Sequence, residues 1–239
     1  DYDADGVSAA SILHKALTEY GVEVYAVVPE RENGYGLNAD IVAQYAEEIY
    51  MGLVITVDCG ISDREKVEFI KNELGADVIV TDHHEVPETI PDCIVINPKI
   101  AGQAYPFDGL CGAGVAFKLC AALDGCPPEE MLEYCGDLAA VGTVADVMPL
   151  TGENRTIVKA GLRQLQNTDR PGFCALLEEV GLAGKPVTAE NISYAIAPRL
   201  NAAGRMDSAV TALQLVLCED EDRAVELAHK LSDINIQRQ

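Results

Sequence analysis

The amino-acid sequence predicts an α/β fold: a parallel sheet with helices on both faces, followed by a mainly helical region. Up to about Pro98, short β-branched apolar runs alternate with amphipathic segments of roughly a dozen residues, which is the pattern of βαβ units. Beyond Pro98 the strand-like runs disappear and only helical spacings remain. We therefore expect an α/β part at 1–112, which lacks its first strand, and a helical part at 113–239 that ends in a truncated helix.

In the α/β part, each expected element follows from local patterning and its start or stop signals. Gly21 ends the first helix, Asn38 can cap the second, and Ser62 with Glu65 forms a capping box for the third. A first strand is expected immediately before Asp1. The helices are expected at 7–20, 38–50 and 62–74, and the strands at 24–28, 53–57, 78–80 and 93–96.

In the helical part, apolar residues recur at the spacing of amphipathic helices. No capping signal follows the final segment, so we expect that helix to continue beyond Gln239. The expected helices are 113–123, 128–141, 155–166, 172–180, 208–218 and 221–236.

Composition excludes several classes of protein. The 239 residues contain no run of 18 apolar residues, and the first residues have neither the basic start nor the apolar stretch of a signal peptide. The net charge of −22 argues against extensive wrapping of nucleic acid, but not against a local phosphate-cleaving site. None of the eight cysteines is spaced C-x-x-C, which favours free thiols in a reducing cytoplasm.

Acidic and imidazole side chains follow the expected strands where each strand ends. Asp58 follows 53–57, the Asp82-His83-His84 triplet follows 78–80, and Asp1 and Asp3 would follow the expected first strand. Ligands in open α/β sheets bind at this carboxyl edge. Crowded carboxylates with imidazole suit Mn²⁺, Mg²⁺ or iron, and a pair of such ions can hold and hydrolyse a phosphoester. The alternative for the triplet is an exposed turn that happens to hold two histidines.

Asp146 is a further candidate ligand. It stands between apolar residues in Ala145-Asp146-Val147, and a lone buried acid is costly unless it is paired or bound to metal. The alternative is an ordinary helix-terminal cap.

These motifs together resemble those of the DHH phosphoesterase superfamily, in the same order along the whole chain. Within it, they are similar to RecJ-type single-strand-specific 5′→3′ exonucleases. The motifs are Asp1-Tyr2-Asp3-Ala4-Asp5-Gly6, Asp58-Cys59-Gly60, Asp82-His83-His84, Gly112-Ala113-Gly114, Ala145-Asp146-Val147-Met148-Pro149-Leu150 and Asn201-Ala202-Ala203-Gly204-Arg205.

The resemblance implies roles for individual residues. Five residues would ligate two divalent ions, Mn²⁺ or Mg²⁺, with Asp58 as the bridging ligand: Asp1, Asp3, Asp58, His83 and Asp146. Catalysis would also involve Asp82, which orients the histidines, and His84, which lies beside the metals or the scissile phosphate. Asp5 would support the N-terminus of its own helix.

The resemblance also implies how substrate is held. Arg31 and Arg205 match positions that would grip a 5′-phosphate. Tyr35 would stack on a base or simply fill its loop, and Asn201 is counted with the substrate-binding residues. RecJ-like chains continue into further domains, which would carry most of the nucleic-acid-binding surface. The α-amino group of Asp1 would lie close to the metals here.

The implied function is a metal-dependent exodeoxyribonuclease of DNA repair and recombination. Its expected partner is single-stranded DNA with a 5′-phosphate, with a helicase and a single-strand-binding protein as further candidates. We expect a cytoplasmic monomer without membrane contact. Two alternatives remain: a phosphodiesterase of short oligonucleotides or cyclic dinucleotides, or a pyrophosphatase, within the same superfamily; and a catalytically inactive scaffold of replication assemblies.

Overall fold

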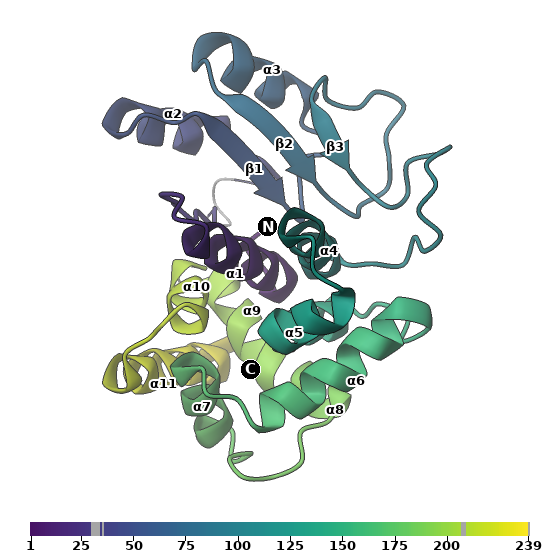
Figure 1. Ribbon diagram of the computed structural model, residues 1–239. Helices are drawn as coiled ribbons and strands as arrows, with labels where there is room; N and C mark the ends of the chain where they lie inside the picture. Colours follow the sequence, from purple (N-terminus) through teal and green to yellow (C-terminus); the bar gives the residue numbers. More distant parts are fainter. Residues whose placement is uncertain (30–33, 35, 207–208, 239) are drawn as a thin grey trace.

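A small parallel sheet forms one end of the molecule (Figure 1). The computed structural model describes residues 1–29, 34, 36–206 and 209–238, with residues 205 and 206 described by their backbone alone. The strands are β1 (Leu53–Val57), β2 (Asp77–Thr81) and β3 (Ile94–Ile96), in the order β1-β2-β3. Val57 pairs with Thr81, and Thr81 pairs with Ile96, so the three carboxyl ends are aligned at one edge.

Helices cover both faces of this sheet, which confirms the predicted fold class (Figure 1). On one face lie α2 (Ala39–Glu48) and α3 (Arg64–Glu73); on the other lie α1 (Ala4–Glu19) and α4 (Gly112–Asp124). Side chains alternate along the strands as the pleat requires. Val54 therefore packs into the small apolar cluster beneath α3, whereas Ile55 and Val57 pack into the large core on the opposite face.

The remaining helices form a second layer against α1 and α4 (Figure 1). Ile12 of α1 belongs to the same buried core as Leu200 and Leu231, so α1 joins the sheet to the helical part. The boundary between 1–112 and 113–239 therefore runs through a shared core, and the division stays a prediction. The helices are α5 (Pro128–Ala145), α6 (Gly152–Gln166), α7 (Pro171–Glu179), α8 (Ala189–Asn191), a π-helical turn (Ile192–Ile196), α9 (Ala197–Met206), α10 (Val210–Val216) and α11 (Glu221–Arg238).

Two local predictions were wrong. Residues 24–28 form no strand, because they pair with no strand of the described sheet. The cap of α3 is Asp63 and not Ser62, and its carboxylate accepts the Leu37 N–H at 2.8 Å instead of capping its own helix. The second difference arises because Leu37, 26 residues away, uses the Asp63 carboxylate.

Helix lengths in the second half also differ from prediction. We expected α5 to end at residue 141, but it reaches Ala145, and the Thr143 hydroxyl donates to the Ala139 carbonyl at 2.7 Å within it. The helix at Ala197–Met206 was not predicted. Pro198 and Gly204 are both unfavourable in helix interiors, and the burial of the intervening residues overrides that preference.

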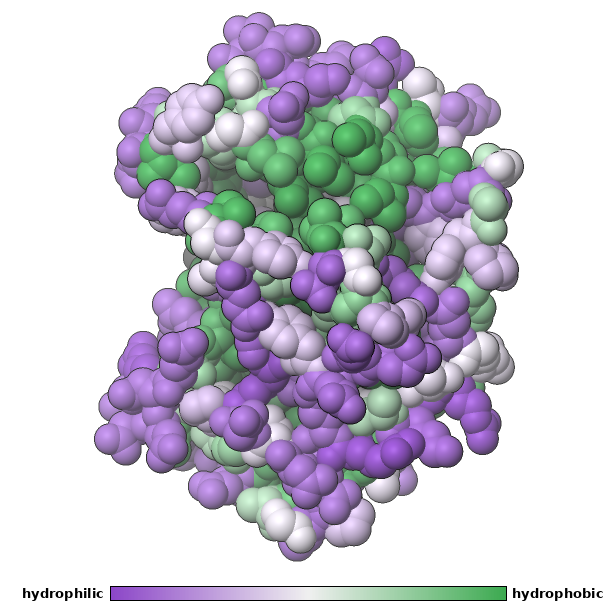
Figure 2. All heavy atoms as spheres, viewed as in Figure 1, coloured by the Kyte–Doolittle hydropathy of each residue, from purple (hydrophilic) through white to green (hydrophobic). Residues whose placement is uncertain are grey.

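An apolar groove of about 750 Å³ lies beside β1, lined by side chains of α1, α2 and residues 22–29. Figure 2 shows hydrophobic residues gathered around this hollow. Within the described residues β1 pairs only with β2, so its other edge faces the groove. The strand expected before Asp1 stays a prediction. No helix within the described ranges is long and apolar enough to cross a membrane.

Candidate metal centre

Asp58 is the first residue after β1 and lies at the centre of the candidate site. Its side chain is buried, with the residue only 1% exposed. Its φ of 57° is in the left-handed region, which Asp tolerates better than most non-glycine residues. The chain thus turns sharply where the strand ends. This places a carboxylate at the carboxyl edge of the sheet, where the sequence predicted it.

The N-terminal loop brings two more carboxylates to Asp58. The amino group of Asp1 donates to the Val57 carbonyl at 3.2 Å, which ties the loop to the end of β1. Asp3 caps α1, where it accepts the N–H groups of Asp5 at 2.9 Å and Gly6 at 3.0 Å. One carboxylate oxygen from each of Asp1, Asp3 and Asp58 lies within 4.8 Å of the others.

His83 approaches Asp58 from the end of β2. Its Nε2 lies 3.0 Å from Asp58 Oδ1 and 3.6 Å from Asp146 Oδ2, and the residue is 5% exposed. Asp146 is the C-cap of α5, so the helical part contributes it. One atom each from Asp58, His83 and His84 forms a second group within 4.8 Å, so Asp58 belongs to two such groups.

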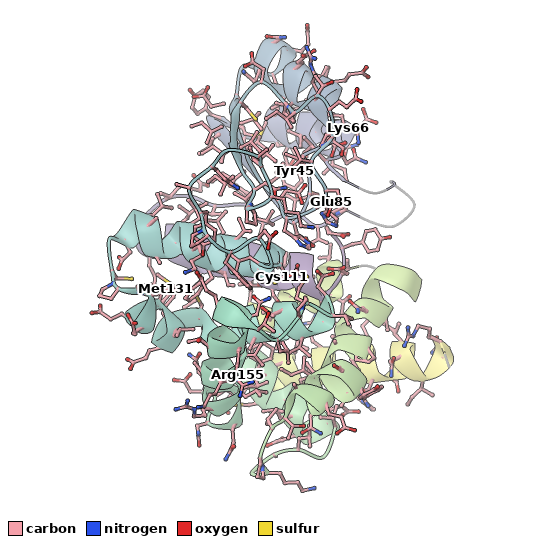
Figure 3. The ribbon with its side chains drawn as sticks, turned by 90° about the vertical axis from the view of Figure 1, so that its right-hand side faces the viewer. Tyr45, Lys66, Glu85, Cys111, Met131 and Arg155 are labelled. Carbon is pink, nitrogen blue, oxygen red and sulfur yellow. The ribbon has the colours of Figure 1, made fainter. Side chains whose placement is uncertain are left out.

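Asp5 lies in the first turn of α1, as predicted, and it also caps a second helix. Its carboxylate accepts the N–H groups of Gly112 at 2.7 Å and Ala113 at 2.9 Å at the N-terminus of α4. Its Oδ2 lies 3.8 Å from His83 Nε2, and Asp5, His83 and Asp146 form a third group of potential ligands. This N-terminus of α4, marked by Cys111 in Figure 3, lies at the junction between the sheet and the helical part.

Asp82 organises the two histidines. Its Oδ1 accepts the N–H groups of His83 at 2.7 Å and His84 at 3.0 Å, and lies 2.7 Å from His84 Nδ1. Its Oδ2 accepts the Ile61 N–H at 2.9 Å. The Asp82 carboxylate thereby orients the His84 ring and fixes the turn that carries His83.

Asn97 is a supporting residue that the sequence reasoning missed. It follows β3, is buried, and donates from Nδ2 to the His84 carbonyl at 2.9 Å. The available signal was its position directly after the expected strand 93–96, at the same edge as the other strand ends. Asn97 thus holds the histidine turn from the end of the neighbouring strand β3.

The electrostatics of the cluster are those of crowded, buried carboxylates. Burial, reinforced by the Asp3 and Asp146 charges, raises the pKa of Asp58 to about 8. Burial and the Asp58 charge raise the pKa of Asp5 well above its ordinary value. Burial tends to raise the pKa of Asp82 too, but hydrogen bonds from His84 and Ile61 outweigh it and lower that pKa. The centre of the cluster therefore resists ionisation, whereas Asp82 holds its negative charge.

Unsatisfied polar atoms show that a cation fits this cluster. Asp58 Oδ1 and both ring nitrogens of His83 are buried without a hydrogen-bond partner, because the 3.0 Å approach between them is not aligned as a hydrogen bond. Such atoms are costly to bury unless something compensates them. A divalent ion would satisfy Asp58 Oδ1 and His83 Nε2, the ring nitrogen that faces the carboxylates, and a mixed carboxylate and imidazole set suits Mn²⁺ or Mg²⁺.

Residues 1–143 match the model of the family described as "DHH family, N-terminal domain". The chain belongs to the DHH family. The match covers the N-terminal loop, Asp58 and the Asp82-His83-His84 triplet, and it ends inside α5.

Known relatives of this DHH chain are exonucleases. The Bacillus subtilis single-stranded-DNA-specific exonuclease RecJ is 42% identical over 241 residues, which cover 100% of this chain and 30% of that protein. The crystal structure of an exonuclease RecJ bound to manganese has a TM-score of 0.88 at 40% identity and covers 100% of this chain and 60% of that one. RecJ from Thermus thermophilus in complex with Mn²⁺ has a TM-score of 0.85 at 38% identity, and the match covers 100% of this chain and 34% of that one. The same protein in complex with Mg²⁺ has a TM-score of 0.73.

Most of the residues predicted to bind substrate are not among those that the structure describes. Arg31 and Tyr35 lie outside the described residues of this DHH chain, and so does the side chain of Arg205. Asn201 is described, and its Oδ1 accepts the Ala4 N–H at 2.7 Å. That contact points toward the N-terminal metal loop and was not expected from the sequence.

Val147, next to Asp146, occupies a position that normally favours glycine. The Met148 N–H donates to the Thr143 carbonyl and the Val147 N–H to the Val144 carbonyl, both at 3.2 Å, which is the Schellman pattern at the end of α5. Val147 has a φ of 57°, which strains the backbone of a β-branched residue, and it is 86% exposed. Burial of its side chain therefore does not offset the strain.

Val147→Gly should therefore stabilise the DHH chain. We expect a gain of about 1 kcal/mol, which raises the melting temperature by roughly 2–4 °C for a chain of this size. Thermal unfolding in EDTA measures it. Val225→Gly, at an exposed position inside α11, is the matched control and should lower the melting temperature. Equal losses in both variants would contradict the strain at Val147.

Proposed function

We propose that this chain is the metal-binding catalytic part of a two-metal-dependent, single-stranded-DNA-specific 5′→3′ exonuclease. The observation that carries the proposal is the convergence of three ligand groups on Asp58 and His83, whose buried polar atoms lack partners. The RecJ relatives, solved with Mn²⁺ and with Mg²⁺, support both the substrate class and the metals. The chain spans 30% of the length of the Bacillus subtilis relative, so this activity is proposed for the whole protein that contains the chain.

Asp1, Asp3, Asp58, His83 and Asp146 are the proposed ligands. Asp58 belongs to both the Asp1-Asp3 group and the histidine group, which supports a bridging role. Asp5 joins the candidates because it lies in the group with His83 and Asp146. Most ligands come from residues 1–112, but Asp146 is the C-cap of α5, so the helical part completes the site.

When bound, two divalent ions supply an activated water and stabilise the leaving oxygen of a phosphodiester. The residues of this chain prepare that chemistry. Asp82 fixes the His84 ring, whose side chain is 40% exposed and lies at the rim of the cluster, where it can contact a phosphate oxygen. Burial excludes water from the Asp58 side, which strengthens every charge interaction there.

As the family resemblance implies, Arg31 and Arg205 would bind the 5′-phosphate and so determine from which end the strand is cleaved. Tyr35 would stack on a base. A 5′-phosphate held by guanidinium groups at a fixed distance from the ligands would place the first internucleotide bond over the cluster. We further propose that the protein acts in DNA repair and recombination, in the cytoplasm and as a monomer. Its proposed partners are a helicase and a single-strand-binding protein.

Metal binding can be tested on the 239-residue chain itself. Mn²⁺ at about 100 times its dissociation constant should stabilise the fold by roughly 2.7 kcal/mol, because it binds the folded cluster and not the unfolded chain. The measurement is the melting temperature with increasing Mn²⁺, with Ca²⁺ as a comparison and EDTA as the reference. An unchanged melting temperature, together with no binding by calorimetry, would contradict the metal centre.

The reaction is tested on the protein that carries this chain, with 5′-phosphorylated single-stranded DNA of increasing length. Successive release of mononucleotides from the 5′ end of long strands is the expected result. Cleavage confined to very short or cyclic substrates, or to pyrophosphate, would overturn it in favour of another DHH phosphoesterase. Metal binding without any cleavage would indicate an inactive scaffold.

A further inference from the structure

The Asn201-Ala202-Ala203-Gly204 segment of α9 lies directly against the N-terminal metal loop, although the two are at opposite ends of the chain. Asn201 Oδ1 accepts the Ala4 N–H at 2.7 Å, a contact between residues 197 apart in sequence. Ala202 and Ala203 are fully buried. This segment therefore belongs to the interior of the fold at the point where the ligand loop is held.

The hydrogen bond from Ala4 completes the cap of α1. The first N–H groups of a helix have no partner within the helix and need one from outside. The Asp3 carboxylate accepts the N–H groups of Asp5 and Gly6, whereas the Ala4 N–H donates elsewhere. Asn201 supplies the acceptor for this remaining N–H, next to the residue that carries the Asp3 carboxylate.

A second contact between α9 and the loop is made by Gly204. A Cβ added at Gly204 would lie 2.7 Å from the Tyr2 carbonyl oxygen, so only glycine permits this approach. Tyr2 stands between Asp1 and Asp3, and Gly204 lies three residues after Asn201 on α9. The loop is thus fixed on both sides of Asp3, by packing at Tyr2 and by a hydrogen bond at Ala4.

We infer that Asn201 is a positioning residue for the metal centre, acting as a hydrogen-bond acceptor that holds the Asp1–Asp3 loop in its ligating position. This role differs from the substrate contact predicted for Asn201. It rests on the proposed metal centre, because its effect passes through the Asp1, Asp3 and Asp58 group. Residues that orient metal ligands from outside commonly change metal affinity by roughly 10–100-fold when removed.

The acceptor and donor functions of Asn201 can be separated by substitution. Asn201→Ala removes both the Oδ1 acceptor and the Nδ2 donor, whereas Asn201→Asp keeps an acceptor oxygen for the Ala4 N–H. A positioning role requires only the acceptor. A grip on a phosphate oxygen requires the donor, and a carboxylate there would repel the substrate.

The experiment is a Mn²⁺ titration of the 239-residue chain without DNA, followed by the free-ion electron paramagnetic resonance signal. Asn201→Ala should weaken Mn²⁺ binding by about tenfold and Asn201→Asp should restore it to within about threefold of wild type. Amide hydrogen exchange should show faster exchange at Ala4 in Asn201→Ala and protection in Asn201→Asp. Asn191→Ala is the control, because Asn191 Oδ1 accepts the Thr188 N–H in a helix cap away from the ligand loop.

The outcomes distinguish the inference from the proposed function. If wild type and Asn191→Ala bind Mn²⁺ and Asn201→Ala binds it equally well, the positioning role is wrong. If Asn201→Asp binds Mn²⁺ as weakly as Asn201→Ala, the acceptor is not what matters and the inference also fails. If wild type itself binds no Mn²⁺, the metal centre fails, while the exchange rate at Ala4 still reports whether Asn201 holds the loop.

Discussion

Asp58→Asn should abolish phosphodiester cleavage by the protein that carries this chain while leaving the fold intact. We expect a loss of at least a hundredfold, since Asp58 lies in both the Asp1-Asp3 group and the histidine group and its removal weakens both. Asparagine is the better test than alanine, because Asp58 has a φ of 57° and asparagine tolerates that region. Cleavage rates on 5′-phosphorylated single-stranded DNA give the result. Retention of more than a few per cent of wild-type cleavage would contradict the role.

The same substitution should stabilise the metal-free chain. Burial raises the pKa of Asp58 to about 8, aided by the Asp3 and Asp146 charges, against an ordinary value of 3.8. A group whose pKa is raised on folding contributes stability below its ordinary pKa, and this contribution is lost as the pH rises through the folded value. In EDTA, wild type should therefore lose stability between about pH 4 and pH 8, and Asp58→Asn should flatten this dependence.

Unfolding by urea at pH 5 and pH 8 in EDTA measures the difference. The advantage of Asp58→Asn over wild type should be small at pH 5 and reach a few kcal/mol at pH 8. Asp77→Asn, at an exposed position of β2, is the control and should change stability little at either pH. A variant less stable than wild type at pH 8 would show that the Asp58 carboxylate supports the metal-free fold.

Gly142→Ala should damage both the fold and the metal centre. A Cβ at Gly142, on α5, would overlap Asp5 Oδ1 and the Ala113 side chain. The methyl group must therefore push Asp5 away from the N–H groups of α4, and with it the group that contains His83. We expect a loss of roughly 2–3 kcal/mol in unfolding free energy and at least a tenfold loss in Mn²⁺ affinity. Urea unfolding and calorimetry of Mn²⁺ binding measure the two effects.

Gly161→Ala separates the two effects of Gly142→Ala. A Cβ at Gly161 would overlap the Gly136 carbonyl and the Ala140 side chain where α5 and α6 meet, away from the ligands. It should therefore lower stability by a similar amount. The folded fraction should bind Mn²⁺ as wild type does. Equal Mn²⁺ affinities for both variants would show that Asp5 plays no part in metal binding.

Much of the sheet and its chemistry follows from local pattern. Strand 53–57 was predicted at its observed bounds, because apolar β-branched runs between turn signals mark buried parallel strands. The aligned carboxyl ends then place Asp58 and His83 at one edge, as the strand order requires. The prediction of a strand at 24–28 was wrong, because a local sequence pattern does not show whether a partner strand lies beside the segment.

The sequence by itself determined the fold class, the family and the gathering of acids and histidines at the strand ends, because short-range periodicity and ordered motifs carry that information. Only the tertiary structure decided that Asp5 caps α4, across 107 residues, and that Asn201 holds Ala4, across 197 residues. It likewise decided that Gly142 and Gly204 must lack side chains. These contacts depend on how helices pack against one another, and packing is set by the shape of both surfaces together, which neither local segment encodes alone.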